Sequence, residues 1–306
     1  MNLAGPVTIG SVTLANPVMT ASGTAGYGTE LAGYLDLAEL GAVVVKSLAA
    51  FEWAGNPAPR LAPAGASMLN AVGLQGPGIA DWLQHVLPEL LATGATVVAS
   101  IWGRSVDDYR RAADALADAP EAVVAVEVNL SCPNTEAGRD LFAHEPAATA
   151  EVIAATAGCG RPRWAKLSPN TPRVAEVAGA AAEAGAEAVT LVNTVMGMAI
   201  DPETRTYRLG AGERGGGLSG PAIHPVAVRV VHDVHRAHPD LPIVGVGGVV
   251  DGPTAVELLL AGASAVQVGT ATFADPRAPS RVAADLEHWC RRRGIPAMAE
   301  LIGGLR

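Results

Sequence analysis

The chain has 306 residues, of which 49% are hydrophobic, so it is long and apolar enough to bury a substantial core. Lys plus Arg number 21 and Asp plus Glu number 30, which gives a formal net charge of −9. This balance argues against a general binding surface for nucleic acid or for an anionic membrane. Every apolar run is interrupted before the roughly 20 residues that a membrane-spanning helix requires. The composition therefore excludes disorder as the main state, and we expect a cytoplasmic location.

Short runs rich in Val, Ile and Ala recur along the chain and end in small or polar residues, a pattern typical of buried parallel strands. Eight of them are predicted strands, at residues 17–23, 42–47, 96–103, 125–133, 163–169, 188–194, 242–248 and 265–270. Amphipathic stretches beside them predict helices at residues 30–40, 79–92, 106–117, 147–157, 172–184, 222–237, 253–261 and 280–293.

Eight strand–helix units in a chain of this length predict an α/β fold, the closed parallel (β/α)8 or TIM barrel. An open doubly wound sheet is the alternative, but no linker or composition shift divides the chain, so we expect one domain over residues 1–306. Residues 7–14 predict an N-terminal β-hairpin that covers the barrel floor. Long irregular loops are expected at residues 49–78, 133–146 and 195–221, at the C-terminal face where barrel active sites lie.

The three cysteines lie far apart without a C-x-x-C pair, so neither a disulfide framework nor a metal or iron–sulfur site is expected within this chain. His232, His235 and His238 recur every three residues, but this spacing drifts around a helix and does not bring three ligands together. Cys159 and Cys290 are interpreted as buried thiols. Cys132 lies at the end of the fourth predicted strand among polar residues, where a thiol could act as nucleophile or general base.

The chain has only two lysines, Lys46 and Lys166, and both lie at the ends of predicted strands. This placement favours a functional role, although a buried lysine could also neutralise a core carboxylate. Small residues end the seventh and eighth strands, where barrels commonly bind phosphate, so a phosphorylated ligand or cofactor is expected; tight strand-to-helix turns are the alternative explanation. Residues 215–220 match G-x-G-x-x-G without a preceding strand, so a glycine loop near a cofactor is expected there and not a dinucleotide site.

Several motifs together resemble those of the dihydroorotate dehydrogenases. They are NLSCPN at residues 129–134, Lys46-Ser47, GNPAPR at 55–60, NAVGL at 70–74, KLSPN at 166–170 and Gly247-Gly248. The resemblance extends over nearly the whole chain. Cys132 in the catalytic loop is similar to the class 1 enzymes, and KLSPN together with GNPAPR is more similar to class 1B than to class 1A. The resemblance implies an FMN-containing barrel that oxidises dihydroorotate to orotate in pyrimidine biosynthesis.

The same resemblance implies roles for individual residues. Cys132 would take the proton from C5 of the substrate while hydride leaves C6 for N5 of the flavin, and Lys166 would stabilise negative charge on the reduced flavin. The implied substrate-binding residues are Lys46, Asn70, Ala71, Val72, Gly73, Leu74, Asn129, Asn193 and Thr194. The implied FMN-binding residues are Ser22, Lys46, Ser47, Ser100, Asn129, Lys166, Val192, Gly220, Gly247, Gly248, Gly269 and Thr270. Ser100 stands where the family often has Asn.

A class 1B enzyme would also need a partner. In that class electrons pass from FMN to NAD through a second subunit that carries FAD and a [2Fe–2S] cluster, and the catalytic subunits form a homodimer within a heterotetramer. Three cysteines are too few to hold such a cluster here. The alternatives are a class 1A enzyme that reduces fumarate, an FMN barrel acting on another dihydropyrimidine, a Schiff-base aldolase, and a catalytically silent flavin-binding subunit for electron transfer.

Overall fold

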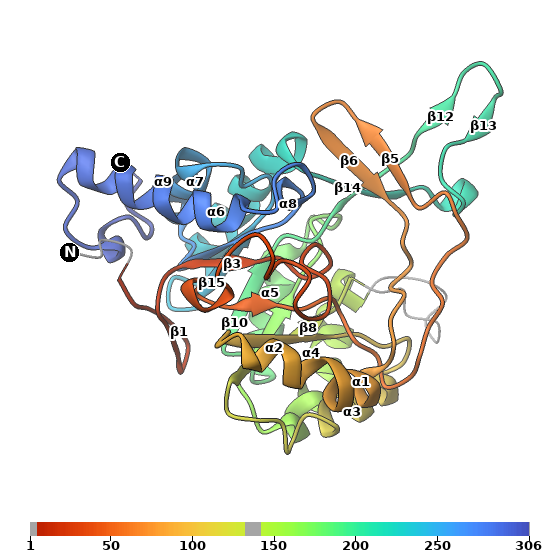
Figure 1. Ribbon diagram of the computed structural model, residues 1–306, viewed down its shortest axis with the longest axis horizontal. Coiled ribbons are helices and arrows are strands. Elements are labelled where there is room, and N and C mark those ends of the chain that lie inside the picture. Colours follow the sequence, from red (N-terminus) through yellow and green to blue (C-terminus); the bar gives the residue numbers. More distant parts are fainter. Residues whose placement is uncertain (1–4, 132–141, 306) are drawn as a thin grey trace.

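The computed structural model describes residues 5–131 and 142–305. Its centre is an eight-stranded parallel sheet in the order β3-β16-β15-β10-β9-β8-β7-β4 (Figure 1). A parallel bridge between Met19 and Ala42 joins the two end strands, and the Gly41 amide donates to the Val18 carbonyl at 2.8 Å. The strands are β3 Val18–Thr20, β4 Val43–Val44, β7 Val97–Ile101, β8 Val123–Asn129, β9 Arg163–Lys166, β10 Ala188–Leu191, β15 Ile243–Val246 and β16 Ala265–Val268.

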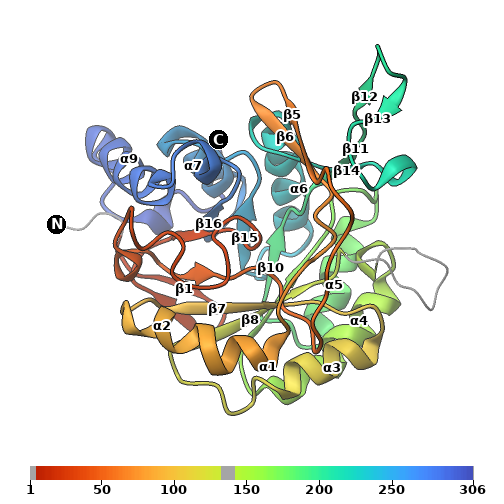
Figure 2. The same cartoon turned by 45° about the vertical axis from the view of Figure 1, so that its right-hand side comes forward.

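Helices lie between the strands and surround them, which confirms the predicted (β/α)8 barrel (Figures 1 and 2). Their bounds are α1 Ile79–Asp81, α2 Leu87–Ala92, α3 Val106–Asp114, α4 Pro146–Ala155, α5 Val174–Glu183, α6 His224–Ala237, α7 Gly252–Ala261, α8 Ala271–Ala274 and α9 Ala278–Arg293. A π-helical turn over Trp82–Val86 joins α1 to α2. Within the described ranges, no helix has the length and apolarity needed to cross a membrane.

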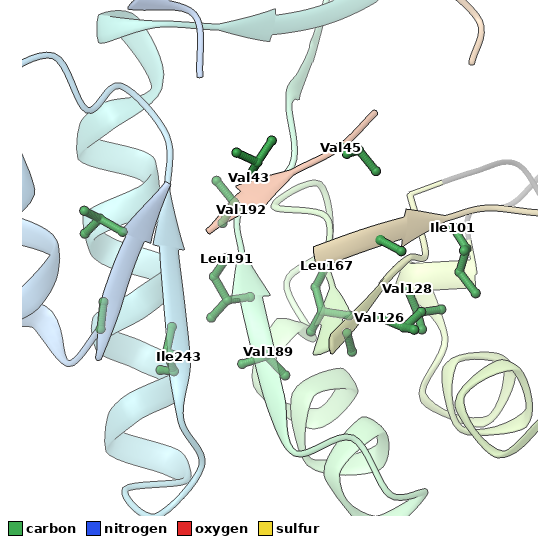
Figure 3. Packing of buried hydrophobic residues seen from close by; sticks show 14 of the residues in the cluster. Val43, Val45, Ile101, Val126, Val128, Leu167, Val189, Leu191, Val192 and Ile243 are labelled. Carbon is green, nitrogen blue, oxygen red and sulfur yellow. The ribbon is translucent and has the colours of Figure 1, made fainter. Parts of the chain in front are cut away.

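The floor of the barrel is a closed apolar layer. Each of the eight strands, or the residue beside it, contributes a buried side chain, among them Met19, Val98 and Trp164. The hairpin of β1 (Val7–Ile9) and β2 (Val12–Leu14) packs its own buried side chains against this layer, as predicted. Because side chains alternate along a strand, the neighbouring residues point outward to the helices. Figure 3 shows part of that outer cluster, including Val126 and Leu191.

The long loops lie at the opposite end as predicted, but they contain a second sheet, so the prediction of irregular structure is wrong for parts of residues 49–78 and 195–221. Strands β5 (Leu61–Ala64), β6 (Ser67–Asn70), β11 (Val195–Gly197) and β14 (Gly216–Ser219) form an antiparallel sheet in the order β11-β14-β6-β5. A separate hairpin, β12 (Ile200–Asp201) with β13 (Thr206–Tyr207), projects from the same side (Figures 1 and 2). The predicted glycine loop is therefore mostly strand β14.

The predicted helix at residues 30–40 is also wrong. The segment consists of turns followed by one 3₁₀ turn over Leu37–Glu39, which begins where the Asp36 carboxylate accepts from the Ala38 amide at 3.0 Å. Gly33 in its middle disfavours a continuous helix. The apolar spacing that suggested a helix still has a structural basis, because Leu31, Leu37 and Leu40 are buried.

Candidate active site

A cavity opens at the C-terminal mouth of the barrel, between the strand ends and the second sheet. It encloses about 1300 Å³ when its open mouth is counted. Its described lining from the strand ends includes Ser22, Lys46, Ser47, Asn129, Lys166, Val192, Asn193, Thr194, Gly247, Gly248, Gly269 and Thr270. The roof contributes Met68, Asn70, Val72, Gly73, Leu74, Ser219 and Gly220. The structure thus brings together residues more than 200 positions apart in the sequence.

Two lysines are the only charged side chains among the described lining residues. The Lys46 ammonium donates to the Gln75 carbonyl at 3.0 Å and lies 5.7 Å from the ring centre of Tyr27. The Tyr27 hydroxyl donates to the same carbonyl. Burial, together with the nearby Glu30 carboxylate, raises the pKa of Tyr27 well above its usual range, so its hydroxyl remains a neutral donor. These contacts hold Lys46 at one side of the mouth.

Neutral amides and hydroxyls form a hydrogen-bonded chain across the bottom of the cavity. The Asn193 amide donates to Asn129 Oδ1 at 3.0 Å, and the Asn129 amide donates to Ser47 Oγ at 3.2 Å. Asn193 Oδ1 accepts from the backbone amide of Thr194 at 2.7 Å. Beneath Asn129, the Tyr109 hydroxyl donates to its backbone carbonyl at 2.6 Å. Each side chain is thereby fixed by its neighbours, which orients polar groups toward a ligand before it binds.

The GNPAPR motif supports the roof segment at residues 70–74. The Asn56 amide donates to the Ala71 carbonyl at 3.0 Å, and Arg60 Nε donates to the Asn56 carbonyl at 2.6 Å. The Trp53 indole donates to the Gly73 carbonyl at 2.9 Å. Gly73 and Leu74 both have positive φ, 73° and 60°. This turn places backbone groups of residues 72–74 along the cavity.

The glycines at the far end of the cavity are required by close packing. Gly248 has φ 69°, and a Cβ there would lie 2.6 Å from the Cβ of His224 and 3.0 Å from the Gly220 carbonyl. Gly247 has φ 136°, and its Cβ would lie 2.7 Å from the Cβ of Ala227. The Thr270 hydroxyl donates to Ser219 Oγ at 2.8 Å nearby. This end offers small residues and hydroxyls, and none of the described residues that line the cavity has a carboxylate.

A buried polar layer that was not predicted from the sequence lies below the cavity. Glu127 of β8 is 0% exposed, and its carboxylate lies 3.4 Å from the Lys166 ammonium. Gln267 of β16, also 0% exposed, donates to Glu127 at 2.8 Å. Both residues lie two positions before a residue that lines the cavity, so strand alternation would have found them. The prediction rested only on the last residues of each strand.

Two of the predicted ligand residues lie behind the described lining. Ala71 is buried in a small cluster with Leu69 and Leu209, because it points to the other face of the roof. Ser100 is buried beneath Ser47, and the two hydroxyl oxygens are 2.9 Å apart, so Ser100 supports a lining residue. Cys132 lies outside the described residues, although the preceding residue, Ser131, lines the cavity.

Metal binding receives no support from the described ranges, where no group of three or more His, Cys, Asp or Glu side chains could hold an ion. His232 and His238 contact different partners. His232 Nδ1 lies 3.4 Å from the Asp233 carboxylate, and His238 Nε2 lies 2.8 Å from the Ala175 carbonyl oxygen. The described lining of the cavity presents two lysine ammonium groups, neutral amides and hydroxyls.

Comparison with known proteins agrees with this site. Residues 6–289 match the family model of dihydroorotate dehydrogenase. The chain is 48% identical over 304 residues to a protein of Desulforudis audaxviator, covering 99% of this chain and 98% of that protein. It is 45% identical over 306 residues to one of Trichlorobacter lovleyi, covering 100% and 99%. Both relatives are named dihydroorotate dehydrogenase B (NAD(+)), catalytic subunit. The resemblance inferred from the motifs is confirmed, and the chain belongs to the dihydroorotate dehydrogenase family.

Proposed function

We propose that this chain is the catalytic subunit of a class 1B dihydroorotate dehydrogenase, which oxidises (S)-dihydroorotate to orotate in pyrimidine biosynthesis. The observation that carries the proposal is the charge pattern of the cavity. Its described lining holds two lysines and no carboxylate, so it favours anionic ligands. A flavin nucleotide and a pyrimidine carboxylate both meet that requirement.

The residues fit FMN as the cofactor. About 1300 Å³ including the open mouth gives room for a flavin nucleotide beside a small acid. Gly247, Gly248 and Gly269 let backbone amides approach a phosphate, and the hydroxyls of Ser219 and Thr270 add donors at the same end. Ser22, Ser47, Asn129, Lys166, Val192 and Gly220 would complete the binding site. FMN supplies the acceptor for the hydride.

The substrate would bind between the asparagines and the roof. Asn70, Asn129, Asn193 and Thr194 present donors and acceptors suited to the ring amides, and the Lys46 ammonium suits the carboxylate. The turn at Gly73 and Leu74 adds backbone groups. Because these groups are already fixed by hydrogen bonds to one another, they hold the substrate in one orientation.

Cys132 would act as the general base at C5 of the substrate. The residue before it, Ser131, lines the cavity, and the Ser131 amide donates to Asn129 Oδ1 at 3.2 Å. Cys132 therefore directly follows a cavity-lining residue in the sequence. A thiolate at this point accepts the C5 proton as the C6 hydride departs.

The partner proposal rests on the names of the relatives, which are NAD-linked catalytic subunits. We propose that this chain forms a homodimer and binds an electron-transfer subunit that carries FAD and a [2Fe–2S] cluster, and that the complex is cytoplasmic. Of the three cysteines, Cys159 and Cys290 are buried and distant in sequence, so the iron–sulfur ligands must come from the partner.

The first experiment is an anaerobic titration followed by the visible flavin spectrum. We expect purified protein to bind FMN and its flavin band to bleach when dihydroorotate is added. Bleaching by dihydrouracil and not by dihydroorotate would contradict the substrate, and a protein that takes up no FMN would contradict the cofactor. Reoxidation by NAD only with the partner subunit, and not by fumarate, would distinguish class 1B from class 1A.

A further inference from the structure

The buried carboxylate of Glu127 is the feature that the proposed reaction does not use. It is 0% exposed, and its Oε1 lies 3.4 Å from Nζ of Lys166, which is itself 4% exposed. Glu127 and Lys166 come from adjacent strands, and both point into the barrel directly above the apolar floor. An ion pair this deep is costly to bury, so its partners must compensate each other closely.

Three side chains surround the Lys166 ammonium. Nζ donates to Ser22 Oγ at 3.0 Å and to Gln267 Oε1 at 3.4 Å, in addition to its ion pair with Glu127. Gln267 also donates to Glu127 Oε2 at 2.8 Å, so it bridges the two charges. The contacts with Ser22 and Gln267 are hydrogen bonds, whereas the contact with Glu127 is an ion pair in which Glu127 Oε1 accepts no hydrogen bond from the described residues. Lys166 is therefore held in one position at the cavity wall.

The arrangement has an electrostatic consequence. Lys166 lines the cavity, whereas Glu127 lies in the layer beneath it. A negative charge 3.4 Å from the ammonium offsets much of the field that the ammonium would exert on a ligand in the cavity. Lys166 thus presents a fixed hydrogen-bond donor to the cavity, and the electric field of its charge on a ligand is weakened by Glu127.

We propose that Glu127 is a positioning residue that fixes the Lys166 ammonium at the cavity wall and, by offsetting its charge, lowers the reduction potential of bound FMN. This inference rests on the proposed FMN-dependent function. A purely structural role would require only that the pair stabilise the barrel. The proposed role additionally requires that the charge of Glu127 be felt by the cofactor, and this difference can be measured without turnover.

The principal test is the two-electron reduction potential of FMN bound to Glu127→Gln, measured at equilibrium with a redox dye. The amide has nearly the same shape and keeps an acceptor for Gln267, but it removes the negative charge. We expect reduction to become about tenfold more favourable, an upward shift of about 30 mV for a two-electron couple. The dissociation constant of sulfite for the oxidised flavin should fall by about the same factor. Glu176→Gln, at a side chain of α5 that is 61% exposed, is the matched control and should change neither value.

If the reduction potential of FMN bound to Glu127→Gln is unchanged or lower, the role inferred for Glu127 is wrong, whereas the proposed FMN-dependent function is unaffected. Failure of the unsubstituted protein to bind FMN would overturn the proposed function and this inference with it.

A second measurement tests the pairing without any redox readout. Lys166→Met leaves the Glu127 carboxylate buried without its cation. The melting temperature of this variant should therefore be several degrees lower than that of the unsubstituted protein, both without and with added FMN. Combining it with Glu127→Gln should recover more than half of that loss. Losses that simply add in the double variant would show that the two residues do not act as a pair and would overturn the proposal.

Discussion

The two ends of the barrel are built from the same strands but serve different purposes. Trp164 lies in the apolar floor layer, and Lys166, two residues later on β9, lines the cavity. Three residues of β8 point inward. Ala125 is apolar and lies in the floor layer, Glu127 is charged and buried above it, and Asn129 is polar and lines the cavity. The floor is closed by the β1–β2 hairpin, whereas the mouth is covered by a sheet that leaves a cavity open.

This contrast indicates how stability and function are divided along each strand. At the floor, burial of apolar side chains contributes stability and no polar group is exposed to a ligand. At the mouth, polar groups are fixed by one another at the expense of apolar packing. Substitutions at the floor should therefore lower the free energy of unfolding and leave ligand binding intact. Substitutions at the mouth should weaken ligand binding and have little effect on the free energy of unfolding.

The largest effect is expected at Cys132. Replacing it with Ala removes the proposed general base, which typically contributes about 10²–10⁴-fold to rate. We expect flavin reduction by dihydroorotate, followed by stopped-flow absorbance, to slow by that factor while FMN remains bound. Cys290→Ala, on α9 away from the cavity lining, is the control and should reduce at the normal rate. An unchanged rate in Cys132→Ala would exclude the thiol as the base.

The pH dependence of the same step provides a second readout. A free thiol has a pKa of about 8.5 and acts as a base only when ionised, so the rate should rise with pH and level off above the thiol pKa. Burial raises the pKa of the Cys159 and Cys290 thiols, so both ionise less readily than a free thiol. The rise should therefore belong to Cys132 and disappear in Cys132→Ala.

At the floor, Trp164→Ala should mainly affect folding. Trp164 is 0% exposed and fills the barrel interior, so its truncation should lower the free energy of unfolding by about 3–5 kcal/mol. Denaturant unfolding measures this loss, and the FMN dissociation constant of the folded protein should stay unchanged. Trp289→Ala on α9 removes an equal volume from a half-buried position and should cost less. Equal losses for the two variants would refute the special role of the floor.

At the mouth, Asn193→Ala should mainly affect the substrate. The Asn193 side chain contacts both Asn129 and the Thr194 amide, so its loss removes one proposed ligand and loosens two others. Removing a partner from buried polar groups costs about 1–3 kcal/mol, which predicts a KM raised by roughly fivefold to 150-fold. Val195→Ala in the neighbouring β11 serves as the control. A raised FMN dissociation constant with unchanged KM would reassign Asn193 to the cofactor.

The sequence predicted the regions where local pattern decides the structure. Short apolar runs identified the eight barrel strands, and their ends identified Lys46, Lys166 and Asn129 as neighbours in one cavity. The roof was not predictable in this way. Strands such as β5 (LAPA) and β14 (GGLS) contain Pro or Gly and show no alternation, and β6 pairs with β14 across about 150 residues of chain.

The glycines in β14 were interpreted as a loop because the need for glycine there comes from residues that are distant in the sequence. A Cβ on Gly216 would lie 2.5 Å from the Asn70 carbonyl, and one on Gly217 would lie 2.1 Å from Thr194 Oγ1. These glycines are needed because the roof strand approaches other backbone and side chains closely. Glu127 was missed for a different reason, because only the last residues of each strand were considered and Glu127 lies two positions before Asn129 on β8.

The smallest effect is expected at the contact between the β1–β2 hairpin and the barrel floor. Glu187 accepts a hydrogen bond from the Ser11 amide at 2.7 Å, next to Gly10 with φ 60°. The bond is exposed, so Glu187→Ala should lower the free energy of unfolding by about 1 kcal/mol or less. Glu187→Gln, which keeps an acceptor, should retain most of that stability. FMN binding and KM should be normal in both variants, because the apolar layer separates the hairpin from the cavity. Weaker FMN binding in Glu187→Ala would mean that the floor and the mouth are energetically coupled, which would contradict the division of roles along the strands.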